Sequence, residues 1–250
     1  MPEAKKTTRR QPAKNPTKTT KAAKTPGTGK APERTTQATP PPPPAAPAQP
    51  PRFAITGTGR SGTGYLAALM EANGITCGHE GWWRPDGIGR HTGGLTGDAS
   101  WLALPAIETG AWSGPVALVV RHPVNTVRSL VGTKLFEPGD HDTHLTTAYR
   151  RFAHTHCPQT ASLDPLQAAV EFWSDWNTRC AAVADVKLRI EDLNQPWALA
   201  ELGDALGVHL DPTACARVPT DTNHRERAAV PATRIWQLLD GRAAHFGYHP

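Results

Sequence analysis

The segment that most constrains the fold runs from Phe53 to Leu66 and reads Phe-Ala-Ile-Thr-Gly-Thr-Gly-Arg-Ser-Gly-Thr-Gly-Tyr-Leu. A short apolar strand leads into a loop rich in glycine and hydroxyl residues, which opens directly onto a helix. Such a turn directs several backbone N–H groups and the positive end of a helix dipole toward one point. Because glycine has no Cβ, an anion can approach this backbone closely. The segment therefore predicts a strand–loop–helix unit that binds a phosphate or a sulfate.

Charge is distributed unevenly along the 250 residues. Residues 1–51 carry ten Lys or Arg and two Glu, a net charge of +8, which leaves 17 basic and 20 acidic groups, a net charge of −3, for the rest. The first segment has almost no large apolar side chain and contains the run Pro40–Pro44, which favours polyproline II geometry. We expect residues 1–51 to form a disordered basic tail and residues 52–250 to form the folded domain. The tail could contact nucleic acid or an anionic surface, although a solubilising role is the simpler interpretation.

The cysteines and the hydropathy pattern indicate the compartment. Cys77, Cys157, Cys180 and Cys215 form no Cys-x-x-Cys pair, which disfavours a zinc knuckle and suggests no disulfide framework. No apolar run approaches the roughly 20 residues that a membrane-spanning helix needs. The N-terminus lacks the apolar core of a secretory signal. We therefore expect a soluble protein in a reducing, cytoplasmic compartment.

From Arg52 onward, strand and helix patterns alternate. The expected strands are 52–56, 75–77, 115–120 and 186–190, and the expected helices are 63–73, 99–107, 124–131, 165–184, 196–206 and 231–246. Asp98 and Asp164 are expected to cap helix N-termini, and Gly207 to end a helix. Residues 78–97 resemble an irregular loop, residues 133–160 show no clear pattern, and the tryptophans of 165–184 suit a buried helix face. This order predicts an α/β fold, a single three-layer domain whose central parallel sheet is like that of P-loop NTPases, with ligands at the carboxyl ends of the strands.

Two classes of nucleotide-binding protein are alternatives for the glycine loop. A nucleoside-triphosphate loop has a lysine before its final hydroxyl residue, but Gly62 is followed directly by Thr63, and the strand at 116–120 leads to Arg121 rather than to an aspartate. An NAD(P)-type fingerprint is present as Gly57-x-Gly59-x-x-Gly62, with Glu80 near the distance expected for a ribose-binding acid. Nothing downstream suggests a hydride-transfer site. A non-catalytic, anion-binding scaffold protein that uses the basic tail is a further alternative.

Four motifs, taken together and in this order, resemble a known family. They are Thr-Gly-Thr-Gly-Arg-Ser-Gly-Thr, Gly78-His79-Glu80, Val120-Arg121-His122-Pro123 with Ser129, and Leu188-Arg189-Ile190-Glu191-Asp192-Leu193. The set resembles the sulfotransferases that use 3′-phosphoadenylyl sulfate (PAPS), and within them the tyrosylprotein and bacterial branches. The resemblance covers roughly residues 52–248. It implies an enzyme that moves a sulfuryl group from PAPS to a hydroxyl or amine, on a small-molecule or polymer-borne acceptor, with no metal.

The resemblance also implies how the donor is bound. The phosphosulfate end would be held by Thr58, Gly59, Arg60, Ser61, Gly62 and Thr63, with Arg60 also placed near the bridging oxygen as a catalytic cation. Arg121 and Ser129 would hold the 3′-phosphate, and arginine suits such a bidentate grip. Arg225 or Arg227 could close over the nucleotide, although the glycine-rich form usual in the family is absent.

Acceptor activation requires a base, for which the resemblance points to Glu80. His79 is the competing candidate, because its ordinary pKa near 6.5 suits proton transfer. Trp82, Trp83 and Arg84 could line the acceptor pocket, or the tryptophans could be buried. The remaining polar groups are expected to brace the site (Arg189, Glu191, Asp192) or to lie in a solvated loop (His141, Asp142, His144).

Overall fold

The computed structural model describes residues 49–88, 94–219 and 227–250. By its internal contacts the chain divides into Met1–Pro44 and Ala45–Pro250, and all described residues belong to the second unit. The strands are β1 Phe53–Thr56, β2 Cys77–His79, β3 Trp83–Arg84, β4 Gly87–Ile88, β5 Gly97–Ala99, β6 Val116–Val120 and β7 Val186–Arg189. The α-helices are α1 Thr63–Ala72, α2 Leu104–Glu108, α3 Pro123–Gly132, α4 His144–His156, α5 Pro165–Val183, α6 Pro196–Leu206, α7 Pro212–Cys215 and α8 Ala232–Leu239. Short 3₁₀ turns occupy Trp101–Ala103, Pro158–Ser162, Ile190–Asp192 and Arg242–Phe246.

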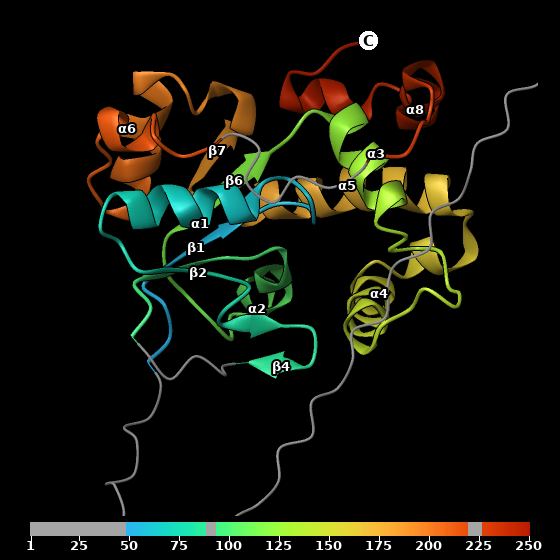
Figure 1. The fold of residues 1–250 in the computed structure, drawn as a ribbon, viewed down its shortest axis with the longest axis horizontal. Coiled ribbons are helices and arrows are strands. Elements are labelled where there is room, and N and C mark those ends of the chain that lie inside the picture. Colours follow the sequence, from blue (N-terminus) through green and yellow to red (C-terminus); the bar gives the residue numbers. More distant parts are fainter. Residues whose placement is uncertain (1–48, 89–93, 220–226) are drawn as a thin grey trace, which may run out of the picture. The chain divides into compact units, whose positions relative to one another are not determined.

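Five of the strands form a parallel sheet in the order β2-β5-β1-β6-β7, and β3 and β4 form a separate hairpin (Figure 1). The register pairs Phe53 with Gly97 and Ala54 with Val116. A Cβ on Gly97 would lie 2.0 Å from the ring of Phe53, so glycine lets β1 and β5 pair at this point. The predicted α/β class with a central parallel sheet is confirmed.

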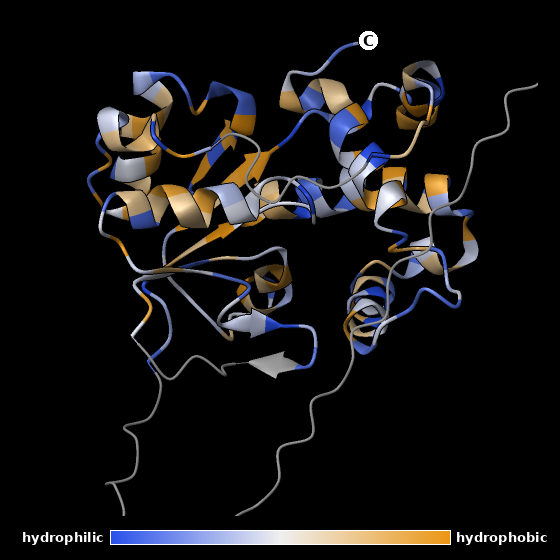
Figure 2. Cartoon of the chain, viewed as in Figure 1, coloured by the Kyte–Doolittle hydropathy of each residue, from blue (hydrophilic) through white to orange (hydrophobic). Residues whose placement is uncertain are grey.

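The sheet is buried on both faces, which explains why its central strands are apolar throughout. Alternate residues of β1 and β6 divide between two cores: Ala54, Leu118 and Val120 face α3, α5 and α8, whereas Phe53, Ile55 and Val119 face α1 and α6. Figure 2 shows β1 and β6 coloured as hydrophobic, while the helices carry both hydrophobic and hydrophilic residues. Trp173 and Trp176 of α5 are fully buried, as expected. The described residues include no helix long and apolar enough to cross a membrane.

Several helix boundaries follow the local signals in the sequence. The Asp164 carboxylate accepts hydrogen bonds from the N–H groups of Leu166 and Gln167, each at 3.0 Å, and so caps α5. Gly207 ends α6 in the left-handed conformation, with φ of 66°. The helix expected at 231–246 is interrupted instead, because Asp240 and Gly241 both have positive φ and separate α8 from a 3₁₀ turn.

The expectations for residues 75–107 need correction. The second strand is Cys77–His79 rather than 75–77, and the region expected to be an irregular loop holds the β3–β4 hairpin and the start of β5. Asp98 does not cap a helix: it lies inside β5, and Ser100 caps the following turn by accepting from Leu102 N–H at 3.1 Å. Strands β2 and β5 have three residues each, one of them glycine, so their pairing with each other and that of β5 with β1 define them.

Candidate active site

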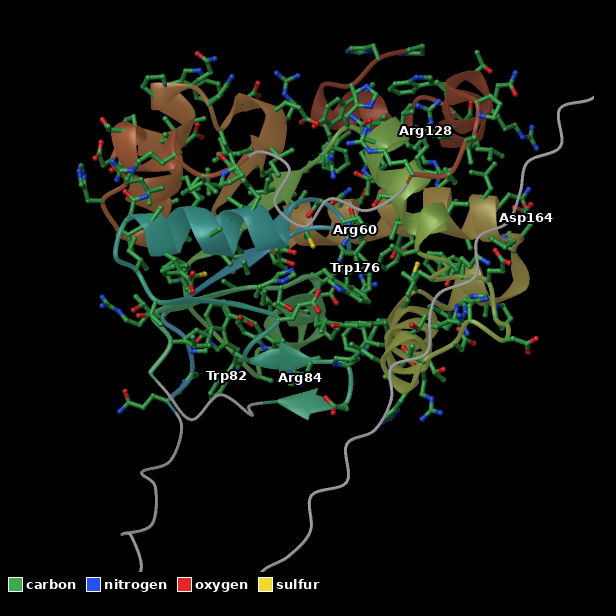
Figure 3. All side chains as sticks on the ribbon, in the orientation of Figure 1. Arg60, Trp82, Arg84, Arg128, Asp164 and Trp176 are labelled. Atoms are coloured by element: carbon green, nitrogen blue, oxygen red, sulfur yellow. The ribbon has the colours of Figure 1, made fainter. Side chains whose placement is uncertain are left out.

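The carboxyl ends of the parallel strands meet at one edge of the sheet, and a cavity of about 910 Å³ opens there. Its lining comes from the loop after β1, the end of β2, the β3–β4 hairpin, the end of β6 and helix α4, which lies opposite the hairpin (Figure 1). Figure 3 labels Arg60 on the loop side of this region and Arg84 on the hairpin side. The lining includes Gly59, Arg60, Gly62, Thr63, His79, Glu80, Arg84, Arg121 and Tyr149. The fold thus brings together residues from three of the four sequence motifs.

The glycine loop has the geometry of an anion site. Gly62 precedes α1 with φ of 108°, and as a glycine it offers no side chain to cap the first turn of this ten-residue helix. A Cβ on Gly62 would lie 2.0 Å from Cδ1 of Ile190, so the loop has no room for a side chain there. Ser61 is fully buried and its hydroxyl has no hydrogen-bond partner within the described chain. Uncapped N–H groups and an unpartnered buried hydroxyl are the donors that a phosphate or sulfate needs.

Two loop residues, Thr58 and Ser61, are fully buried and do not line the cavity. The N–H of Thr58 donates to Oδ1 of Asn177 on α5 at 3.2 Å, so it is committed to the helix beneath the loop. Asn177 is fully buried in the middle of α5. Thr58 therefore contributes to the shape of the loop, while Gly59, Arg60, Gly62 and Thr63 line the cavity.

Arg60 and Ser129, which are 69 positions apart, are in contact. Nε of Arg60 donates to the Ser129 hydroxyl on α3 at 3.0 Å, and the Arg60 carbonyl accepts from Nη1 of Arg121 at 3.3 Å. Arg60 has a φ of 72°, a left-handed conformation that is uncommon for a residue with a side chain. Arg60, expected at the phosphosulfate end of the donor, therefore lies beside Arg121 and Ser129, which were expected to hold the 3′-phosphate.

Arg121 lies near the charges of both Arg227 and Glu191. Burial lowers the pKa of Arg121, repulsion from Arg227 lowers it further, and the charge of Glu191 opposes this fall. Arg227 is held against α3 by a hydrogen bond from Nη1 to Oδ1 of Asn125 at 3.1 Å. In the described ranges neither Arg121 nor Arg227 forms an ion pair with a carboxylate. A bound anion would relieve this repulsion. Arg225 lies outside the described residues.

The motif that follows β7 supports the turn after β6. Glu191 accepts from the N–H of His122 at 2.9 Å and from the hydroxyl of Tyr248 at 2.7 Å, and Arg189 pairs with Asp192 at 2.7 Å. Glu191 thus holds the backbone next to Arg121. Arg189 and Asp192 pair with each other, so the bracing role expected of all three residues stays a prediction.

Glu80 and His79 lie at the end of β2, opposite the loop. Nε2 of His79 is 3.1 Å from the hydroxyl of Thr63 and 4.0 Å from Oε1 of Glu80. The side chain of Glu80 is 17% exposed, compared with 37% for His79, and its Oε2 accepts a hydrogen bond from the hydroxyl of Tyr149. His79 is thus engaged with the loop, while Glu80 faces the cavity between the loop and α4.

The turn after Glu80 is fixed by a buried carboxylate. Asp98 accepts hydrogen bonds from the N–H groups of Gly81, Trp82 and Trp83 at 2.9, 3.1 and 3.3 Å. Burial raises the pKa of Asp98, and these three hydrogen bonds oppose that rise. Glu80 itself adopts a left-handed φ of 54°, which the turn maintains. Asp98 therefore determines the direction in which Glu80 leaves the sheet.

The other candidates from the sequence are distributed as follows. Arg84 lines the cavity, whereas Trp83 is buried and packs edge-on against Trp112. Asp142 pairs with Arg150, and the described part of the chain contains no group of three or more His, Cys, Asp or Glu able to hold a metal.

The sequence pattern indicated no site role for Tyr149 or Asn177, and for Asp98 it indicated only a helix cap, which is wrong. Asn177 carried a detectable signal, since it is an amide on the apolar face of a helix. The sequence around Tyr149 and Asp98 gave no signal of their contacts, because only the fold brings Tyr149 to Glu80 and Asp98 to the turn at Gly81.

Comparisons with known proteins find similar chains among the solved structures. No family model matches the chain, and no curated protein matches it. A sulfotransferase from Alicyclobacillus acidocaldarius is similar with 16% identity and a TM-score of 0.45, over 80% of this chain and 95% of that one. The mouse sulfotransferase SULT7A1 complexed with PAP has 14% identity and a TM-score of 0.38, over 70% of this chain and 64% of that one. The sulfotransferase domain from the curacin biosynthetic pathway has 12% identity and a TM-score of 0.45, over 81% and 99%. At these values the function has to be argued from the geometry of the site.

Proposed function

We propose that this protein is a sulfotransferase that moves a sulfuryl group from PAPS to a hydroxyl acceptor. The observation that carries the proposal is the convergence of the glycine loop, the cations Arg60 and Arg121, and the carboxylate Glu80 around one cavity, with the charge of Arg227 close to Arg121. Anion donors lie on one side and a proton acceptor lies on the other. Sulfuryl transfer requires both.

The residues fit a donor with two anionic ends. The buried Ser61 hydroxyl and the first N–H groups of α1 would bind the phosphosulfate end. Arg121, Arg227 and Ser129 would bind the 3′-phosphate, whose negative charge would offset the repulsion between the two arginines. Arg60 lies between these groups, with its carbonyl against Arg121 and its Nε on Ser129.

The chemistry assigns a role to each side of the cavity. PAPS supplies an activated sulfuryl group whose leaving phosphate takes the electron pair of the broken S–O bond. Arg60 would neutralise the charge that develops on the leaving oxygen. Glu80 would accept the proton of the attacking hydroxyl. His79 would donate to the Thr63 hydroxyl through Nε2–H, so that the hydroxyl keeps its own proton for the anion.

The acceptor would enter between the β3–β4 hairpin and α4. The lining of the cavity includes the apolar side chains of Trp101, Leu130, Leu135 and Leu145, with Thr133 and Thr146 among them. Leu145 is 49% exposed at the start of α4. We therefore propose an acceptor with an apolar or aromatic body, either a small molecule or a group on a polymer. The four cysteines are buried free thiols, which agrees with a role in a reducing compartment such as the cytoplasm.

The proposal is tested by calorimetric titration of the purified protein with 3′,5′-adenosine bisphosphate (PAP), the product nucleotide of PAPS. We expect PAP to bind with micromolar or better affinity and to raise the Tm, and ATP and NAD to bind much more weakly. Stabilisation by NAD or ATP without binding of PAP would contradict the proposal and favour one of the other nucleotide classes. The Arg121→Ala variant is the control for site-specific binding.

A further inference from the structure

Tyr149 is the side chain of α4 that reaches the proposed base. Its hydroxyl donates a hydrogen bond to Oε2 of Glu80, across 69 positions of sequence. Burial raises the pKa of Tyr149, and the charge of Glu80 raises it further. The phenol therefore stays protonated and remains a hydrogen-bond donor throughout the range in which enzymes work.

Two sets of contacts fix where this hydroxyl lies. The ring of Tyr149 packs against the buried Trp101, with centroids 5.8 Å apart. The next residue, Arg150, binds both carboxylate oxygens of Asp142 at 2.6 Å and the carbonyl of Leu135 at 2.7 Å. Helix α4 is thus attached to the chain segment before it, and the Tyr149 side chain has little freedom to lose when it binds Glu80.

Glu80 is constrained from three directions. Its N–H donates to the carbonyl of Ala99 at 3.3 Å, the turn that follows is held by Asp98, and Oε2 is bound by Tyr149. The other oxygen, Oε1, lies 4.0 Å from Nε2 of His79. His79 in turn contacts Thr63 at the start of α1. Oε1 is therefore the oxygen on the side of the anion loop.

We propose that Tyr149 is a positioning residue that binds Oε2 of Glu80 and leaves Oε1 to take the proton from the acceptor. This proposal rests on the proposed function. In the step, the acceptor oxygen forms a bond to sulfur and its proton passes to Oε1. The S–O bond to the phosphate breaks, and PAP leaves with the electron pair.

The experiment measures formation of PAP from PAPS by wild type, Tyr149→Phe, Glu80→Gln and the double variant. Water alone and a panel of phenols and alcohols serve as acceptors. Phenylalanine keeps the ring against Trp101, so we expect Tyr149→Phe to retain the Tm and the PAP affinity of wild type. We expect its kcat to fall roughly 10-fold, because a hydrogen bond to a charged group is lost. In the Glu80→Gln background the same change should have little effect, because the group that it positions is absent.

Each result has a distinct meaning. An equal fall in kcat in both backgrounds, or a kcat for Tyr149→Phe equal to that of wild type, would overturn the positioning role and leave the proposed function intact. A loss of PAP affinity in Tyr149→Phe would also overturn it, because the residue would then act on donor binding. No PAP formation by wild type above the buffer rate with any acceptor would overturn the proposed function and this inference together.

Discussion

At the scale of single residues, the site separates groups that bind the donor from the group that accepts a proton. Arg121 and Glu80 both line the cavity, but Arg121 adjoins the glycine loop through the Arg60 carbonyl, whereas Glu80 is bound to α4 through Tyr149. This separation allows the two roles to be measured independently.

Arg121→Ala should therefore weaken binding of the donor nucleotide, whereas Glu80→Gln should lower turnover. We expect Arg121→Ala to raise the Kd for PAP by about 10- to 100-fold, because charge-assisted hydrogen bonds contribute about 1.5–3 kcal/mol. We expect Glu80→Gln to lower kcat by about 10²- to 10⁴-fold and to leave the Kd nearly unchanged. Calorimetry with PAP and steady-state assays with PAPS measure the two quantities. A similar loss of PAP affinity in both variants would contradict this division of roles.

Gly62 should be essential for the anion loop. In Gly62→Ala the new Cβ would meet Ile190 at 2.0 Å, and the residue would have to adopt a φ of 108°. The left-handed backbone alone costs about 1–2 kcal/mol, and the clash adds to this cost or displaces the loop. We expect a lower Tm and a loss of PAP binding.

Gly74→Ala is the matched control for this substitution. Gly74 also has a positive φ, 74°, but a Cβ there would have nothing within 4 Å. We expect it to cost about 1 kcal/mol of stability and to leave PAP affinity unchanged. If Gly62→Ala bound PAP as well as Gly74→Ala does, the loop would not be the anion site.

At the scale of elements, helix α4 is the part of the site that sequence patterns did not reveal. Its position depends on the pair of Arg150 and Asp142, and Arg150 is also hydrogen-bonded to three backbone carbonyls of residues 134–137. In the sequence Asp142 was expected to lie in a solvated loop, and residues 133–160, which include Arg150, showed no clear pattern. Without the Arg150 clamp, Tyr149 and Leu145 would have no fixed position along the cavity.

The clamp predicts a pH dependence of stability. Hydrogen bonds from Arg150 lower the pKa of Asp142 from its ordinary 3.8 to about 2. A carboxyl whose pKa is lower in the folded state adds stability above its unfolded pKa and loses that contribution as the pH falls. We expect Asp142→Asn to have a Tm a few degrees below wild type at pH 7. The difference in Tm between Asp142→Asn and wild type should narrow as the pH falls from about 4 to 2. Calorimetric Tm values across this range test the expectation, and a difference independent of pH would contradict it.

Helix α5 shows the opposite case, an element that local signals specify well. Asp164 caps its start with two hydrogen bonds, and its apolar positions recur at helical spacing. Only the role of Asn177 was missing from the prediction, because its partner, the N–H of Thr58, is 119 positions away.

At the scale of the whole molecule, the chain is divided into Met1–Pro44 and Ala45–Pro250, and the second unit begins before the first strand. The buried indole N–H of Trp112 donates to the carbonyl of Pro51 at 3.1 Å, and the N–H of Arg52 donates to the carbonyl of Thr96 at 2.8 Å. Residues just before β1 thus contribute to the packing of the domain.

Truncation should therefore depend on where it is made. A chain that begins at Ala45 is expected to keep the Tm, the PAP affinity and the activity of the full protein. A chain that begins at Phe53 is expected to be less stable by about 1–3 kcal/mol, because the Trp112 donor loses its partner. Thermal unfolding and PAP titration of both proteins measure this. Loss of function in the longer truncated protein would favour a scaffold that depends on its tail.

The sequence by itself determined the elements whose signals lie within a single segment. The strand, loop and helix at 53–72, the strand leading to Arg121, the cap at Asp164 and the stop at Gly207 all depend on neighbours a few positions away. The tertiary structure decided which distant residues meet: Arg60 with Ser129, Tyr149 with Glu80, and Asp98 with the turn at 81–83. The physical reason is that a helix or a turn is stabilised by contacts close in sequence. A short strand such as β2 or β5, or a buried hydrogen bond, exists only when the folded sheet brings its partner alongside.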